Sequence, residues 1–242
     1  MRFSSIIWKE WLVLKNKFIS TTLGAIVGPL LFLVAFGWGL GNAVEIDGGS
    51  YIDFVIPGII AMLTMTTSFN VVANDINISR VYSKTFEAVM IAPIKTAVFV
   101  LARVTASALR GLYGAALILV IALLFGANLH IDWYFVLVLI LNCFVFSTAG
   151  IIAGIIVDSH ADMAKITSFV ITPMSFLSGT FFPLDRFPDF LRVIFELLPL
   201  TQAIIGLREG VSAAGSWIVP VALFGYLIVM LPISVILCRR AE

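Results

Sequence analysis

The chain has 242 residues, of which 61% are hydrophobic and only 12% are charged. Soluble globular domains carry about 25% charged residues, so this composition excludes a water-soluble particle and indicates an integral membrane protein. The net charge of +1 leaves no basic surface for a phosphate backbone and excludes a nucleic-acid-binding protein.

The first 17 residues are polar and amphipathic rather than continuously apolar. Trp8 and Trp11 lie beside Lys9, Lys15 and Lys17, and this mixture suits the headgroup region of a bilayer. We therefore expect residues 1–17 to form an interfacial helix in contact with membrane lipids. The alternative is a frayed extension of the first span.

Six apolar segments are candidates for membrane-spanning helices, which need roughly 20 residues each. The segment over 166–182 is shorter than the others and contains Pro173. The predicted spans are 20–41, 54–74, 98–126, 133–157, 166–182 and 216–238. The sequence thus predicts an all-α, polytopic membrane fold in a single domain.

An even number of spans places both termini on one side of the membrane. If that side is cytoplasmic, only Arg186, Arg192 and Arg208 among the 15 Lys and Arg residues face outward. Cytoplasmic loops are enriched in Lys and Arg, so both termini are expected in the cytoplasm. The predicted location is a cell membrane.

The inner loop over 75–97 contains a short amphipathic pattern at 80–92. Its apolar members, at i, i+4, i+7 and i+8, are Tyr82, Phe86, Val89 and Met90. Its polar members are Arg80, Lys84 and Glu87. Pro93 ends the pattern, because the residue before a proline avoids the helical region. Such a helix either rests on lipid or docks into a groove on a partner, and the spacing favours neither.

The stretch over 183–213 is apolar but is broken by prolines and contains several charges. It cannot form a simple span. Two short helices that enter the membrane part-way and return would fit this pattern, since proline sets helix starts and stops.

Three further patterns have both a structural and a functional interpretation. Arg103 and Arg110 share a helical face, and Arg110 either lines a functional cavity or extends to the headgroups. Pairs of glycines four residues apart, at Gly24/Gly28, Gly37/Gly41 and Gly150/Gly154, permit close helix packing within the chain or between chains. His160 between Asp158 and Asp162 suggests a metal site, but a solvated turn is favoured, and no metal site is predicted.

Several chemistries lack their residues in this sequence. No Asp, Glu or His lies near the middle of a predicted span, which argues against a proton-coupled transporter. No protease or hydrolase motif and no phosphate-binding GxxxxGKS or GxxxxGKT loop is present. The chain is therefore not expected to be an enzyme or to bind ATP in a phosphate-binding loop.

Four segments together resemble the membrane permease of a type-2 ABC exporter, of the small class without a fused ATPase. The segments are YIDFVIPGII (51–60), FEAVMIAPI (86–94), ITPMSFLSGTFFPLDRFP (171–188) and LLPLTQAIIGLREG (197–210). The resemblance covers nearly the whole chain and implies a bacterial or archaeal inner membrane as its location. It implies an interfacial N-terminal helix, six spans, an inner coupling helix and an outer re-entrant hairpin.

The resemblance also implies the partners. Permeases of this family dimerise, as homodimers or with a paralogue, and each copy docks a separate ATP-binding subunit that holds ATP and Mg²⁺. The coupling residues implied here are Arg80, Tyr82, Lys84, Phe86, Glu87 and Met90. This chain would then need no cofactor of its own.

The sequence also offers candidates for a substrate cavity. Apolar, adaptable side chains in the second and fifth spans, with Arg110, are candidates: Met62, Met65, Phe69, Phe169 and Phe176. Core packing is the alternative for each Met or Phe. We expect a hydrophobic drug-like, lipid or lipid-linked glycan substrate, and the alternative functions are a stand-alone channel, a secondary transporter or a membrane scaffold.

Overall fold

The computed structural model describes residues 18–32, 51–86, 95–124, 131–210 and 217–240. It also describes positions 8, 12, 15, 16, 34, 35, 45, 46, 49, 50 and 129. Within these ranges the chain is a bundle of helices. The one extended pairing there joins β1 (Glu45–Ile46) to β2 (Gly49–Ser50) in antiparallel register. The predicted all-α fold class is confirmed for this part of the chain.

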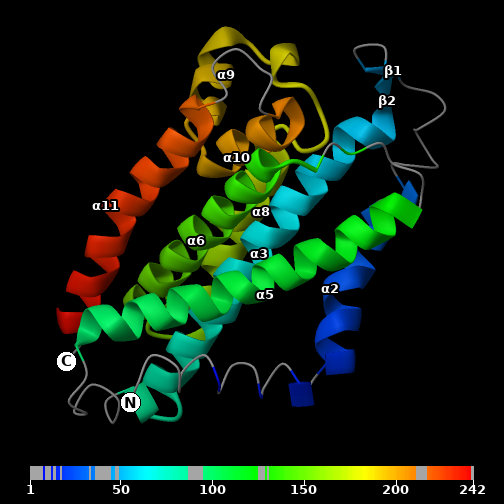
Figure 1. Ribbon diagram of the computed structural model, residues 1–242. Coiled ribbons are helices and arrows are strands. Elements are labelled where there is room, and N and C mark those ends of the chain that lie inside the picture. The colour runs from blue at the N-terminus through cyan, green and yellow to red at the C-terminus, as the bar shows by residue number, and fades with distance from the viewer. Residues whose placement is uncertain are drawn as a thin grey trace.

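Four of the described helices are long and apolar enough to cross a membrane. They are α3 (Tyr51–Val81), α5 (Thr96–Leu124), α6 (Trp133–Ile156) and α11 (Ile218–Arg240). The central helix is α3, which packs against both α5 and α6, while α11 lies along α6 (Figure 1). The chain is therefore a multi-pass membrane protein.

The predicted count of six spans is not reached by length and composition in the described residues. Helix α2 (Phe18–Phe32) has 15 residues, and most of the rest of the expected span over 20–41 lies outside them. The expected interfacial helix over 1–17 also lies almost entirely outside the described residues.

The segment expected to span at 166–182 is helical from His160 to Leu177, in three consecutive parts. These are α7 (His160–Ile166), the π-helical η2 (Thr167–Ile171) and α8 (Thr172–Leu177). The helix begins earlier than predicted because the Ser159 side chain caps it, accepting a hydrogen bond from the Asp162 amide at 3.1 Å. It ends earlier because Gly179, with a φ of 78°, forms a turn.

After this turn come η3 (Leu184–Arg186), α9 (Asp189–Glu196) and α10 (Pro199–Glu209). Helices α9 and α10 meet at an angle of 89°. Pro188 immediately precedes α9 and Pro199 begins α10, in keeping with the preference of proline for helix starts. If the bent pair crosses the membrane as one unit, the candidate spans number five.

Glycines set how closely α3 and α6 approach. An added Cβ at Gly150 would lie 2.5 Å from the Phe69 carbonyl oxygen, and one at Gly154 would lie 2.8 Å from that of Ala73. The Gly150/Gly154 pair therefore packs within the chain. Nothing lies within 4 Å of the corresponding positions at Gly24 and Gly28, and the third predicted pair, Gly37/Gly41, falls outside the described residues.

The two ends of the bundle are distinct. At one, which we call the Arg80 end, the end of α3 and the start of α5 meet the ends of α6 and α11 in one apolar cluster. At the other, the Arg208 end, the rings of Trp133 and Trp217 lie 5.5 Å apart between centroids. Tryptophan is enriched where helices leave a membrane.

Candidate functional site

One face of α3 carries neutral polar side chains that are only partly buried. Thr66, Thr67, Asn70 and Asn74 occupy neighbouring turns of the helix, and we call them the polar stripe. A neighbouring face of α3, which includes Phe69 and Ala73, packs against α6.

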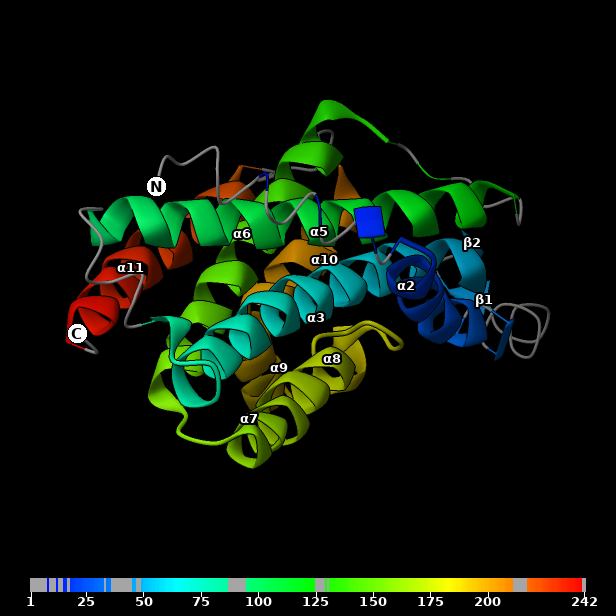
Figure 2. The ribbon, with the colours of Figure 1, turned by 90° about the horizontal axis from the view of Figure 1, so that it is seen from below.

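The polar stripe lies on the side of α3 between α5 and η2. An added Cβ at Gly114 of α5 would lie 3.9 Å from the Thr67 hydroxyl oxygen, and the Thr167 hydroxyl of η2 lies 3.3 Å from the Asn70 side-chain oxygen. In the view from below, α3 is flanked by α5 on one side and by the α7–α8 segment on the other (Figure 2). The polar stripe thus lies on a face of the bundle that is formed by α5, α3 and the α7–α8 segment, with α3 in the middle.

Polar side chains of this kind are costly against lipid, since hydrocarbon offers an amide no hydrogen-bond partner. Polar residues within membrane helices usually face a bundle interior or a water-filled cavity. The partial exposure of Asn70 and Asn74 therefore points to water or another protein chain on this face. The spacing of these polar residues is visible in the sequence, whereas Met62, Met65 and Phe69, predicted there for their apolar and adaptable side chains, lie on another face of α3.

Of the predicted cavity residues, the structure places Met62, Met65 and Phe69 in the core of the chain, with exposed fractions of 9%, 0% and 3%. Core packing was the alternative for these three. Phe169 and Phe176, in contrast, are 77% and 49% exposed on η2 and α8. The first group is therefore buried in the core, and the second lies at the surface.

The two arginines of α5 differ in their surroundings. Arg103 forms an ion pair with Asp75 of α3, and its guanidinium lies 5.4 Å from the centre of the Phe99 ring. Asp75 and Arg103 also line a small cavity between α3 and α5, together with Val71, Val72, Ala106 and Ser107. Arg110 is partly buried, two turns further along the helix.

The predicted amphipathic helix over 80–92 is interrupted in the structure. Arg80 belongs to the last turn of α3, and Lys84 adopts a φ of 48°, which breaks the helix before Thr85. Tyr82 is 64% exposed whereas Phe86 is 2% exposed, so the prediction that they share one helical face is wrong. Glu87 and Met90 lie outside the described residues.

Phe86 anchors the chain after the break. Its ring packs against that of Phe99 at 6.1 Å between centroids, within the apolar cluster of the Arg80 end. Tyr82 and Lys84 remain at the surface, and the Tyr82 ring faces that of His160 at 6.5 Å. Of the described residues predicted to couple to a partner, these two are the most accessible.

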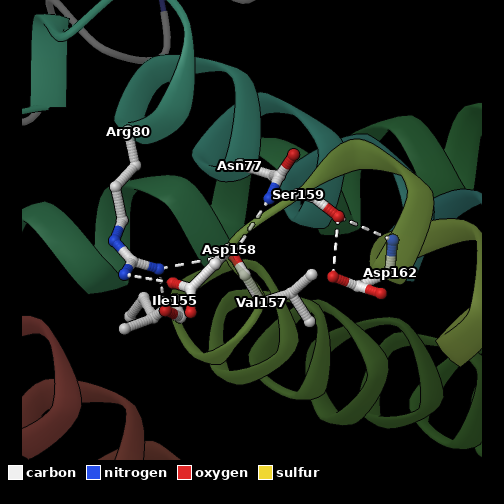
Figure 3. A network of polar contacts seen from close by, with 7 residues as sticks. All are labelled: Asn77, Arg80, Ile155, Val157, Asp158, Ser159 and Asp162. Carbon is white, nitrogen blue, oxygen red and sulfur yellow. Dashed lines mark hydrogen bonds and ion pairs between the residues drawn. The ribbon is translucent and has the colours of Figure 1, made fainter.

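Arg80 is engaged within the chain. Its guanidinium donates hydrogen bonds to the carbonyl oxygens of Ile155 and Val157, the latter at 3.4 Å, and pairs with the Asp158 carboxylate at 2.9 Å. Asn77, one turn earlier, donates to the Val157 carbonyl at 3.1 Å. Figure 3 shows these contacts gathered around the end of α6.

The turn over 158–162, considered as a metal site from its sequence, has structural contacts. Asp158 pairs with Arg80, and Asp162 pairs with Lys165 at 2.6 Å and accepts from the Ser159 hydroxyl at 2.7 Å. In the described part of the chain, no three His, Cys, Asp or Glu residues gather closely enough to hold a metal ion.

Arg208 of α10 holds the Arg208 end together. Its guanidinium donates to the carbonyl oxygens of Phe54, Gly179 and Thr180 at 3.0, 2.9 and 3.1 Å, and it lies 3.6 Å from the centre of the Phe54 ring. The Tyr51 hydroxyl donates to the Phe181 carbonyl at 3.0 Å. The turn after α8 is therefore fixed to both α3 and α10.

Comparison with known proteins identifies similar chains. Residues 1–211 match the family model described as ABC-2 type transporter. The inner membrane transport permease YadH of Escherichia coli (strain K12) is 29% identical over 223 residues, covering 91% of this chain and 86% of that protein. Nodulation protein J of Rhizobium meliloti (strain 1021) is 29% identical over 243 residues, covering 97% and 92%. Nodulation protein J of Sinorhizobium fredii (strain NBRC 101917 / NGR234) is 27% identical over 203 residues, covering 82% and 77%.

Proposed function

The chain belongs to the ABC-2 type transporter family, and on this premise we propose that it is the membrane subunit of an ATP-driven exporter. A separate ATP-binding subunit would hold ATP and Mg²⁺ as its substrate. This chain would supply the translocation path and no covalent chemistry. Its six spans would include α2 and the α7–α8 segment, with α9 and α10 as an outer re-entrant hairpin.

The polar stripe on α3 is the observation that carries this proposal. Amide and hydroxyl groups along a membrane-embedded face are best explained by a passage that admits water and cargo. The neighbouring α7–α8 segment exposes Phe169 and Phe176. A second copy, or a paralogue, packed against this open face would enclose a passage with one polar and one apolar side.

Such a passage suits an amphiphilic cargo. Hydroxyl-rich groups would meet Asn70 and Asn74, while acyl or aromatic groups would meet Phe169 and Phe176. Among the expected substrates, a lipid-linked glycan combines both chemistries and is preferred to a wholly apolar drug.

The Arg80 end is proposed to face the cytoplasm, because this orientation places most Lys and Arg residues on the inner side. Tyr82 and Lys84 would then contact the ATP-binding subunit, together with the chain that follows Phe86. Nucleotide binding shifts a conformational equilibrium only through differential contacts with its two states, and those contacts would lie in the ATP-binding subunit.

Cysteine labelling tests whether the polar stripe is hydrated. In a background with Cys143 and Cys238 replaced, Asn70→Cys and Asn74→Cys are expected to react with a charged methanethiosulfonate reagent. The matched control is Val229→Cys on α11, whose native side chain is 60% exposed on the outside of the bundle. A thiol in lipid stays protonated, so the stripe positions should react at least about tenfold faster. Equal rates would place the stripe against lipid and contradict the proposal.

Reconstitution tests the source of energy. The chain is purified with each candidate ATP-binding subunit from the same genome and placed in proteoliposomes with a lipid-linked glycan. We expect a stable complex and ATP-dependent transport, and Lys84→Glu should weaken assembly. Transport by this chain alone, driven by an ion gradient, would instead identify a secondary transporter.

A further inference from the structure

The end of α6 is capped by side chains from a different helix. The last carbonyl groups of any α-helix lack intrahelical partners and carry partial negative charge. Here Arg80 donates to the carbonyl oxygens of Ile155 and Val157, and Asn77 donates to the latter at 3.1 Å (Figure 3). The two donors come from the final turns of α3.

The capped position is also a joint between helices. Val157 leaves the helical conformation, with φ −90° and ψ 130°, and α7 begins at His160. Asp158, which completes the Arg80 contacts, lies between the two helices and is 84% exposed in its side chain. Arg80 therefore binds both the last carbonyl groups of α6 and the carboxylate of Asp158 in the connection between α6 and α7.

On its other side, Arg80 lies one turn before the break at Lys84. The chain after this break is anchored by Phe86, which is buried against Phe99 at the start of α5. The segment around Phe86 follows directly on α3, so its displacement would act on the end of that helix as well as on the apolar cluster that Phe86 shares with α5 and α6. Together with Asn77, the guanidinium connects the end of α3 to the α6–α7 joint, and it alone of the two also pairs with Asp158.

We propose that Arg80 is a positioning residue that transmits movement from the chain after α3 to the α6–α7 joint, rather than a contact of the ATP-binding subunit. This inference rests on the proposed function. The side chain is 29% exposed and uses its donors on two carbonyl groups and a carboxylate. Because α7 leads into η2 and α8, the same connection reaches the helix that carries Phe169 and Phe176.

The first test uses the permease without any partner. Arg80→Lys keeps the positive charge, but a single ammonium cannot reproduce the planar fork of a guanidinium. Hydrogen–deuterium exchange at residues 158–165 is expected to quicken in Arg80→Lys and not in Arg239→Lys, the same change at an exposed position of α11. Unchanged exchange at 158–165 would overturn the positioning role.

The second test uses the complex with the ATP-binding subunit. Arg80→Lys and Arg80→Ala are expected to assemble and hydrolyse ATP as the wild type does, while cargo moved per ATP falls by about tenfold, a typical size for coupling between sites. Asp158→Asn, which leaves the carbonyl contacts in place, should lower this ratio less. Loss of assembly in Arg80→Ala with retention in Arg80→Lys would identify a docking charge and overturn the proposal.

The two proposals fail differently. If the wild-type chain assembles with no ATP-binding subunit and transports without ATP, the proposed function is wrong, and the transmission role fails with it. If wild-type transport requires ATP but the ratio is unchanged in both Arg80 variants, only the transmission role is wrong.

Discussion

Replacing Arg208 with alanine is expected to destabilise the Arg208 end and to abolish transport. The substitution removes the donor to three backbone carbonyl groups and the contact with the Phe54 ring. Hydrogen bonds from a charged group are worth more than neutral ones, and the loss of this donor from the buried carbonyls of Gly179 and Thr180 adds a further penalty. We expect the free energy of unfolding to fall by about 3 kcal/mol or more. The measurement is denaturant unfolding in detergent, with transport assayed in proteoliposomes.

Arg192→Ala is the matched control. Arg192 also forms ion pairs, with Asp185 at 2.7 Å and Glu196 at 2.7 Å, but they lie at the surface of α9, where such pairs contribute little. Arg208→Lys should resemble the alanine variant more than the wild type, since a lysine cannot bridge Phe54 and the turn at Gly179 together. Equal stability of Arg208→Ala and Arg192→Ala would contradict the stabilising role assigned to Arg208.

Replacing Gly150 with alanine is the second change expected to have a large effect. The new Cβ would lie 2.5 Å from the Phe69 carbonyl oxygen and 2.7 Å from a Val72 methyl group, so α3 and α6 must move apart. Overpacking of this kind costs about 1–3 kcal/mol. We expect less folded protein by size-exclusion chromatography in detergent and a lower midpoint of thermal unfolding.

Gly225→Ala on α11 is the corresponding control, because nothing lies within 4 Å of the added Cβ. Alanine favours a helix over glycine, so this variant should match or slightly exceed the wild type in stability. A Gly150→Ala protein as stable as Gly225→Ala would show that α3 and α6 are not in close contact.

The positions of three membrane-spanning helices could be predicted from the lengths of the apolar runs in the sequence. Helices α5, α6 and α11 lie where spans over 98–126, 133–157 and 216–238 were expected. Hydrocarbon thickness fixes the length of an apolar helix, so composition alone locates it. The Gly150/Gly154 and Gly24/Gly28 pairs have the same spacing, and only the fold decides that the first pair meets α3.

The structure differs from the sequence prediction where side chains of one helix form hydrogen bonds with the backbone of another. Helix α3 continues to Val81, beyond the expected span over 54–74, with Asn77 and Arg80 bound to the end of α6. No periodicity within residues 75–97 could reveal that partner. The amphipathic pattern at 80–92 was real in composition, but the left-handed conformation of Lys84 divides it. A local pattern cannot report such a backbone break.

The π-helical segment η2 has a consequence for how relatives of this chain could diverge. A π-turn holds one residue more than an α-turn, and here the Thr172 backbone N–H donates to the Thr167 carbonyl, five residues back. Five residues in a π-turn cover roughly the rotation that four cover in an α-helix, so deleting one residue between them would restore regular winding and leave the helix beyond facing nearly the same way. Phe176 would keep its direction, and α7 and its cap would stay in place. The same deletion in a regular α-helical part of the segment would instead rotate everything beyond it by about 100°. The η2 segment is thus the place in this helix where a relative can lose one residue and keep the same lining.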